Sequence, residues 1–138
     1  MKFSYFALII LTTLTLSCKT EKKVSEYFLA GNSSILYKGR TDQLNDSAVA
    51  LISSGSYAKM KVVGDSFTFF ISNGNQDHSY VAIEVNEDYK GRFLVDGNPI
   101  GLKLASKDTS NIKIYKATEA TTGDIILNKI LAENVLKA

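Results

Sequence analysis

The sequence predicts an all-β domain of eight or nine short antiparallel strands, arranged as a β-sandwich or jelly roll. Two observations indicate this fold. Short segments alternate between apolar and polar side chains, as strands with one buried face do. Clusters of turn-forming residues separate these segments at nearly regular intervals. Helical spacing occurs only within residues 126–135, and there we favour a buried strand because Ile125-Ile126-Leu127 suits one equally well.

The strands are expected in the following order. Residues 35–37 and 48–53 are the first two, and the clearest alternation follows over residues 56–63, with Met60 and Val62 on the apolar face. An aromatic run covers residues 66–72, and Gly64-Asp65 before it is typical of a hairpin turn. Further strands are predicted at residues 79–85, 91–95, 100–104, 111–117 and 124–132. In residues 111–117, we expect Ile112 and Ile114 to face away from Lys113 and Lys116.

The N-terminal residues predict export. Lys2 precedes an apolar run over residues 3–16, which is too short for an ordinary membrane span, so residues 1–17 are interpreted as a signal peptide. The sequence Leu14-Thr15-Leu16-Ser17-Cys18 resembles a bacterial lipobox, in which the cysteine is lipidated and becomes the new N-terminus. Ordinary cleavage and an uncleaved anchor are the alternatives.

Cys18 is the only cysteine, so the chain forms no internal disulfide, and its position at the end of the apolar run favours lipidation. The predicted organisation is a signal peptide at residues 1–17, the lipidated Cys18 with a polar tether over residues 18–30, and the β-sandwich domain at residues 31–138. Lys19, rather than an aspartate, directly after the cysteine favours the outer membrane as the location.

The charges nearly balance, with 16 basic and 14 acidic residues. A nucleic-acid partner would require a strongly basic face, so we expect none.

The tripeptide Gly64-Asp65-Ser66 has the letters of the nucleophile motif of Gly-Asp-Ser hydrolases. A catalytic serine needs a strand-to-helix turn, an oriented histidine and an oxyanion hole. Here Ser66 begins a β-rich run, and the only histidine, His78, has no aspartate three residues before it. We therefore expect a turn at this position, no catalytic set in the chain and no enzymatic activity.

The metal-binding residue types are sparse. A lone His78 and a single cysteine are too few for a zinc site. Asp42, Asp46 and Asp65 lack the spacing of a calcium loop, although separate loops of a jelly roll can together form a calcium site. No cofactor and no metal are expected.

Five motifs follow one another over residues 34–133: Tyr37-Lys38-Gly39-Arg40, Ser54-Gly55-Ser56-Tyr57, Met60-Lys61-Val62-Val63-Gly64-Asp65-Ser66-Phe67, Phe93-Leu94-Val95-Asp96-Gly97 and Ile114-Tyr115-Lys116-Ala117-Thr118-Glu119-Ala120. In order and spacing they resemble the N-terminal jelly-roll domain of family 2 carbohydrate esterases. These enzymes deacetylate plant polysaccharides and carry the sandwich before a Gly-Asp-Ser-type (SGNH/GDSL) catalytic domain. The resemblance implies that Ser66 lies in the sandwich and not in an active site.

The resemblance also marks a set of signature positions: Gly39, Arg40, Gly64, Asp96, Gly97, Lys116 and Glu119. Structural roles are expected for them. The glycines occur where turns need a positive φ or a close backbone approach, and Asp96 forms a turn. Lys116 and Glu119 are candidates for an ion pair, and Arg40 for pairing with a carboxylate at a domain junction.

The leading hypothesis is a non-catalytic, carbohydrate-associated module of a surface lipoprotein, with a polysaccharide or oligosaccharide as ligand. Sugars stack on aromatic rings, and the chain has no tryptophan, so Tyr57 and Tyr89 are the best candidate contacts. One alternative is the leading part of an esterase whose SGNH-type catalytic domain lies beyond Ala138. The other is a protein-interaction lipoprotein with an apolar outer face, for which the adjacent Phe69 and Phe70, pointing to opposite faces, are the only hint.

Overall fold

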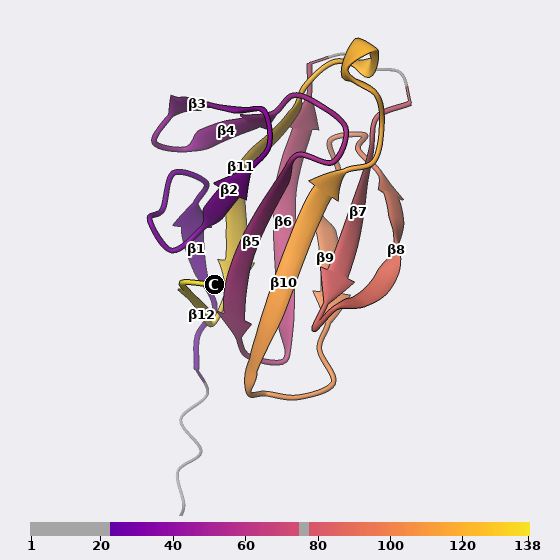
Figure 1. Ribbon diagram of the computed structural model, residues 1–138. Coiled ribbons are helices and arrows are strands. Elements are labelled where there is room, and N and C mark those ends of the chain that lie inside the picture. Colours follow the sequence, from indigo (N-terminus) through magenta and orange to yellow (C-terminus); the bar gives the residue numbers. More distant parts are fainter. Residues whose placement is uncertain (1–22, 75–77) are drawn as a thin grey trace, which may run out of the picture.

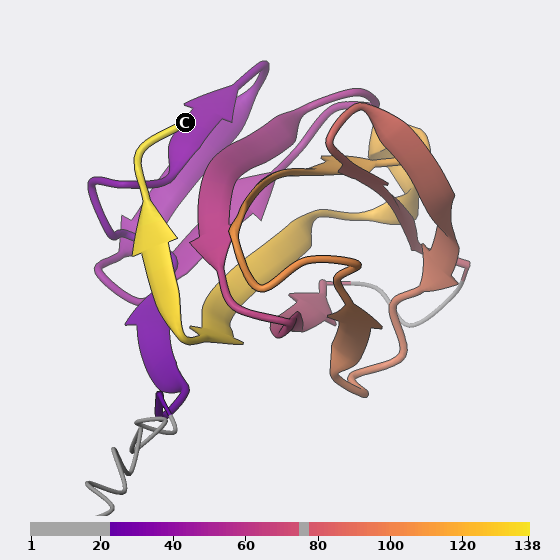
Figure 2. The ribbon, with the colours of Figure 1, turned by 90° about the horizontal axis from the view of Figure 1, so that it is seen from below.

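The computed structural model describes residues 23–74 and 78–138 (Figure 1). Its fold is a sandwich of two antiparallel six-stranded sheets, which confirms the predicted fold class. The two sheets enclose one core, and Figure 2 shows both layers from below. The expected signal peptide, Cys18 and the first part of the tether lie outside the described residues.

Sheet A has the strand order β3 (Thr41–Asn45), β4 (Ala48–Leu51), β11 (Ile125–Ala132), β6 (Ser66–Asn73) and β9 (Ile100–Lys103). Its sixth strand, β1 (Glu26–Leu29), pairs with the second half of β11, and β4 pairs with the first half. The long strand β11 therefore holds two shorter strands end to end along one of its edges.

Sheet B has the order β12 (Asn134–Leu136), β5 (Tyr57–Val63), β10 (Thr109–Lys116), β7 (Tyr80–Val85) and β8 (Asp88–Leu94). Its sixth strand, β2 (Leu36–Lys38), pairs with the start of β5, whereas β12 pairs with the end of β5. The 3₁₀ turn η1 (Ala120–Thr122) connects β10 to β11.

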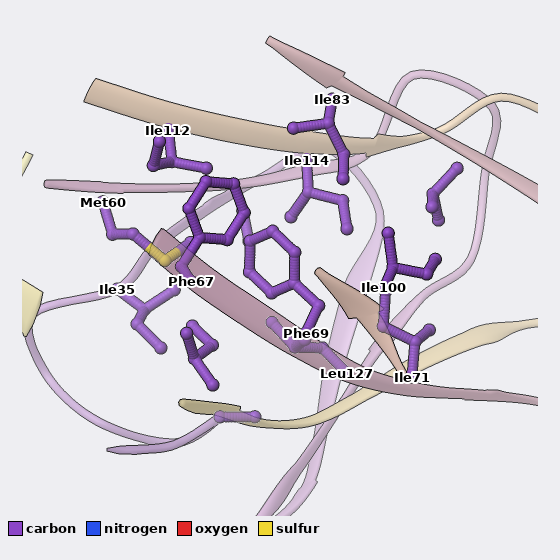
Figure 3. Packing of buried hydrophobic residues seen from close by; sticks show 14 of the residues in the cluster. Ile35, Met60, Phe67, Phe69, Ile71, Ile83, Ile100, Ile112, Ile114 and Leu127 are labelled. Carbon is purple, nitrogen blue, oxygen red and sulfur yellow. The ribbon is translucent and has the colours of Figure 1, made fainter. Parts of the chain in front are cut away.

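The core lies between the sheets and is built by the alternating pattern of their strands. In β5 each second side chain is buried, and β6 does the same with Phe67, Phe69 and Ile71 (Figure 3). The rings of Phe67 and Phe69 meet edge to face, with centroids 5.1 Å apart. Burial of each such side chain stabilises the fold by about 1.5–3 kcal/mol, so the apolar faces of β5 and β6 hold the sheets together.

The predicted hairpin at Gly64-Asp65 is wrong. Strand β5 pairs with β10, β2 and β12 in sheet B, whereas β6 pairs with β11 and β9 in sheet A. The two residues therefore carry the chain from one sheet to the other. The physical reason is that β5 and β6 each bury a full apolar face in the same core. Because they do so from opposite layers, the chain must cross from one sheet to the other between them. Gly64 permits the crossing with a φ of +118°, and a Cβ there would lie 2.9 Å from the side chain of Glu133.

The structure contains three strands that the sequence did not predict, namely β1, β3 and β12. Strand β3 is almost wholly exposed and pairs with β4 through its backbone, so it has no apolar pattern to detect. Strand β1 lies within the segment expected as tether, and its Phe28 packs against the core. The sandwich therefore begins at Glu26.

The loop expected over residues 86–90 is shorter than predicted. Asn86 and Glu87 alone connect β7 to β8, with φ angles of 51° and 71°. Two successive positive φ angles are typical of a tight hairpin turn, and the three residues after it already belong to β8.

Replacement of Tyr37 by phenylalanine should change how stability depends on pH. The half-buried Tyr37 hydroxyl donates a hydrogen bond to the Ala30 carbonyl oxygen at 2.7 Å. Burial raises the pKa of this hydroxyl above its ordinary value of 10.0. Above pH 10 the unfolded tyrosine loses its proton while the folded one keeps it, so the free energy of unfolding falls as the pH rises.

We expect the wild-type protein to lose more stability between pH 9 and pH 11.5 than Tyr37→Phe, which has no group to ionise there. At pH 7 the variant should be less stable by about 1 kcal/mol, because one hydrogen bond is lost. Urea unfolding at each pH measures both effects. Parallel pH profiles for the two proteins would contradict the prediction.

Candidate functional site

The outer face of sheet B combines aromatic, charged and polar side chains and is the best candidate for a binding site. On β5 the outward side chains are Tyr57, Lys59 and Lys61, which alternate with buried residues. The register with β10 places Tyr57 opposite Tyr115, Lys59 opposite Lys113 and Lys61 opposite Asn111. Side chains directly opposite in an antiparallel pair project from the same face, so these three pairs form a ladder of neighbouring polar and aromatic groups.

Lys113 lies at the centre of this face. Its Nζ is 3.4 Å from an Oε atom of Glu84 on β7. The same ammonium lies 5.2 Å from the ring centroid of Tyr57 and 5.0 Å from that of Tyr115. Cations are attracted to aromatic faces at such distances, so Lys113 orients both rings as well as the carboxylate.

A depression of about 510 Å³ opens on this part of the sheet. Most of its lining is polar, and it comprises Tyr57, Lys59, Glu84, Asn86, Glu87, Asn111, Ile112 and Lys113. Binding sites for small molecules are of this size, and they contain a few convergent polar groups beside an apolar or aromatic wall. The arrangement can therefore hold a short polar ligand that offers hydroxyls to the amides and an apolar ring face to the tyrosines.

Strand β8 extends the same face. Tyr89, with 61% of its surface exposed, lies opposite Glu84 across the β7–β8 pair. Arg92 lies further along β8, opposite Ala82, and its guanidinium is 4.1 Å from the ring centroid of Tyr80. Both tyrosines singled out in the sequence, Tyr57 and Tyr89, thus lie on the outer face of sheet B.

Tyr115, Lys113 and Asn111 also belong to this face, although they were not predicted as site residues. A signal for Tyr115 and Lys113 is present in the sequence, because both alternate with the apolar residues of β10. Their proximity to Tyr57 depends on the pairing of β5 with β10, which a single sequence does not reveal.

The outer face of sheet A is different in character. Phe69 is fully buried, whereas Phe70 points outward and meets the ring of Tyr27 edge on, with centroids 5.6 Å apart. The Nζ of Lys129 lies 4.2 Å from the Tyr27 ring centroid. Tyr27 and Leu29 of β1 stay about half exposed. Strand β1 therefore covers Phe70 in part, and a small apolar cluster remains at the surface.

The signature glycines all have positive φ, with +89° at Gly39, +118° at Gly64 and +90° at Gly97. Before Gly97, the carboxylate of Asp96 accepts hydrogen bonds from the backbone and the side chain of Asn98, both at 3.0 Å. These two bonds lower the pKa of Asp96. The side chain of Arg40 is exposed and forms no ion pair with a carboxylate of the described residues.

The expected ion pair between Lys116 and Glu119 is wrong. Lys116 is fully buried, and its ammonium donates hydrogen bonds to the carbonyl oxygens of Ile52, at 2.8 Å, and Gly123. Glu119 is exposed, and its backbone carbonyl accepts the hydroxyl of Thr122. The expected orientation of Lys116 is also wrong, because its side chain lies on the same inner face as those of Ile112 and Ile114.

Ser66 and His78 lie far apart. Ser66 begins β6, its hydroxyl bonds to the Asp65 carboxylate at 3.0 Å, and His78 follows the other end of the strand. An eight-residue strand is roughly 25 Å long. The motif thus occupies a crossing between the sheets, and no strand-to-helix turn follows Ser66.

Metal-binding clusters and membrane-spanning helices are both absent from the described residues. Within residues 23–74 and 78–138, no three side chains of His, Cys, Asp or Glu gather closely enough to hold a metal ion. In the same part of the chain, no helix has the length and apolar character needed to cross a membrane.

Comparison with solved structures gives the same fold class. An acetyl xylan esterase from Butyrivibrio proteoclasticus superposes with a TM-score of 0.71 at 16% identity, over 83% of this chain and 34% of that one. A family two carbohydrate esterase from Clostridium thermocellum, solved with cellohexaose, gives 0.64 at 22% identity, over 75% and 33%. The carbohydrate-binding module CBM36, solved with calcium and xylotriose, gives 0.60 at 16% identity, over 78% and 99%.

These likenesses establish the jelly-roll sandwich. This chain spans about a third of the length of the esterases and nearly the whole of the CBM36 module. No protein with a curated description matches the sequence significantly. The sequence family described as Carbohydrate esterase 2 N-terminal matches residues 37–138, which confirms the resemblance and fits a carbohydrate-associated module. This chain therefore belongs to the family of N-terminal domains of family 2 carbohydrate esterases.

Proposed function

We propose that this chain is a non-catalytic carbohydrate-binding module of a bacterial surface lipoprotein. The observation that supports this most is the depression on the outer face of sheet B, where Tyr57 lies beside the amides of Asn86 and Asn111. Aromatic rings stack against the C–H faces of sugars, and amides bond their hydroxyls. Structural neighbours solved with cellohexaose and xylotriose support a polysaccharide or oligosaccharide as the ligand class.

Replacement of Tyr57 by alanine should weaken glycan binding about tenfold, which corresponds to about 1.4 kcal/mol of stacking and desolvation. The Tyr115 ring lies beside Tyr57 and should retain part of the contact, so Tyr57→Ala with Tyr115→Ala should reduce binding further. Isothermal titration calorimetry of the full chain with xylohexaose and cellohexaose, with affinity electrophoresis in soluble xylan, measures these losses.

The matched control is Tyr27→Ala, which removes an exposed tyrosine from the outer face of sheet A. It should leave glycan affinity unchanged. The proposal fails if Tyr57→Ala binds like the wild type, or if no glycan binds to the wild-type protein. Selective loss of binding to another surface protein in Tyr27→Ala would instead favour the interaction lipoprotein suggested by the Tyr27–Phe70 cluster.

The lipid anchor forms a separate part of the proposal. The apolar run ending at Ser17-Cys18 supports it, and Lys19 favours an outer-membrane location. Treatment of cells with globomycin, which blocks lipoprotein processing, should shift the protein to higher mass. Cys18→Ser should release it from the membrane fraction or leave it unprocessed. An unchanged mass under globomycin would rule out the lipid anchor.

The second candidate function is the leading part of an esterase with an SGNH-type catalytic domain. It is favoured by the family match and by the share of the esterases that this chain spans. The native protein would then be about three times larger than 15.1 kDa and would release acetate from acetylated xylan. Ser66→Ala should leave that activity unchanged, because Ser66 lies at the crossing between sheets.

A further inference from the structure

The ladder on β5 and β10 places two cations directly opposite each other. Lys59 and Lys113 face one another across the strands, with the Tyr57–Tyr115 pair on one side and the Lys61–Asn111 pair on the other. Like charges in such positions destabilise a sheet. A folded domain that keeps this pair on an exposed face therefore gains stability when an anion binds there.

The depression contains as many carboxylates as lysines, but only one carboxylate, that of Glu84, lies close enough to a lysine to form an ion pair. Glu84 pairs with Lys113, and Glu87 also lines the depression. No carboxylate among residues 23–74 and 78–138 lies within 4.0 Å of the ammonium of Lys59 or of Lys61. Arg92 adds a further cation on β8, above the Tyr80 ring. The outer face of sheet B thus presents more positive than negative groups, although the whole chain is nearly neutral.

We propose that the ligand of this face is an acidic glycan, a chain of sugars that carries uronate carboxylates. This inference rests on the proposed function and names its ligand class. Alternate residues on one strand face are about 6.6 Å apart. A sugar ring stacked on Tyr57 or Tyr115 therefore has its carboxylate within reach of the Lys59 and Lys113 ammonium groups. The side chain of Asn111 and the Nδ2 group of Asn86, whose Oδ1 already accepts the N–H of Asn111 at 2.8 Å, are available to the hydroxyls.

Calorimetry of the full chain with two probes tests the inference. Xylotriose carrying one glucuronate substituent is compared with unsubstituted xylotriose at 20 mM and 200 mM NaCl. We expect at least tenfold tighter binding of the acidic probe at 20 mM salt and a clear loss of this advantage at 200 mM, because salt screens exposed charges.

The matched variants are Lys59→Gln and Lys129→Gln. Lys59→Gln removes a cation from the depression and should weaken binding of the acidic probe about tenfold, a much larger loss than the loss of xylotriose affinity. Lys129→Gln removes a cation from the outer face of sheet A and should change neither affinity. Circular dichroism spectra identical to the wild type verify that both variants fold.

The outcomes separate the two proposals. Equal affinity for both probes would overturn the acidic-glycan inference and leave carbohydrate binding standing. Absence of binding for both would overturn the proposed function and the inference together. Competition by double-stranded DNA as strong as by the acidic trisaccharide would also overturn the inference, since the face would then attract any polyanion.

Discussion

Replacement of Lys116 by methionine should lower the free energy of unfolding by about 3 kcal/mol. A hydrogen bond to a charged donor contributes about 1.5–3 kcal/mol, and a buried polar group left without its partner costs about 1–3 kcal/mol. Methionine fills the volume of the lysine side chain but donates no hydrogen bond. The carbonyl oxygens of Ile52 and Gly123 would then lose the donor that they share in the native protein.

The position of these carbonyls explains why the effect should be large. Ile52 follows β4, and Gly123 precedes β11, so the ammonium holds together the two chain segments that enter one end of sheet A. The backbone of Lys116 also takes part, because its N–H bonds to the Ser56 carbonyl at 2.9 Å and its own carbonyl accepts the N–H of Gly55 at 3.0 Å. Burial lowers the pKa of the ammonium, and the nearby carboxylate of Asp124 opposes that shift.

Urea unfolding of the full chain at pH 7, followed by fluorescence and circular dichroism, measures the change. The control is Lys113→Met on the same strand, whose side chain lies on the outer face. It should cost less than about 1 kcal/mol, as the loss of a surface ion pair does. A result in which Lys116→Met is as stable as Lys113→Met would show that the buried ammonium contributes nothing net to the fold.

The sequence predicts the sandwich well because its central strands alternate strongly. Lys116 shows that the alternation of inward and outward side chains holds at each position of a strand, whatever the charge of the residue. It stands two residues after Ile114 and four after Ile112, so strand periodicity alone places it on the inner face. An outward orientation is expected for Lys116 only because its side chain is charged. The carbonyl groups that make burial tolerable come from distant segments, around Ile52 and Gly123, and no local pattern reveals them.

The connection at Gly64-Asp65 shows a second limit of predicting the fold from the sequence. Two β-rich segments joined by two turn residues are usually a hairpin, and nothing local distinguishes a hairpin from a crossing between layers. The distinction depends on which neighbours complete each sheet, and these come from β10 and β11, far along the chain. The unpredicted strand β12 depends on long-range pairing in the same way, since it pairs with β5 and its three residues bury only Val135 in the core.

Part of the candidate site could be predicted from local alternation, and the rest depends on long-range strand pairing. Tyr57 stands on the polar side of a clear alternation, and Tyr89 is surrounded by polar residues, so both were expected to be accessible. Their common face, and the contacts of Tyr57 with Lys113, depend on the order β5-β10-β7-β8. The sequence can therefore identify individual contact residues. The ladder of cross-strand pairs that brings their charges together can be recognised only from the register of the strands.

Replacement of Gly39 by alanine should lower the free energy of unfolding by about 2–3 kcal/mol. Gly39 has a φ of +89°, a conformation that costs other residues about 1–3 kcal/mol. A Cβ at this position would lie 2.9 Å from both Cα and Oγ of Ser56. Ser56 is fully buried, and its hydroxyl donates to the Arg40 carbonyl at 3.0 Å and accepts from Ser53 at 2.9 Å, so it has little freedom to move.

Gly55→Ala is the control that separates the two causes. Gly55 has a similar φ of +77°, but a Cβ there would meet nothing within 4 Å. It should cost only the conformational strain, about 1 kcal/mol, and the difference between the two variants in urea unfolding measures the clash with Ser56. Equal losses for Gly39→Ala and Gly55→Ala would mean that Ser56 moves aside freely, and the Gly39 signature would then reflect backbone conformation alone. A larger loss for Gly39→Ala would assign that signature to the close packing of the β2–β3 connection against the start of β5.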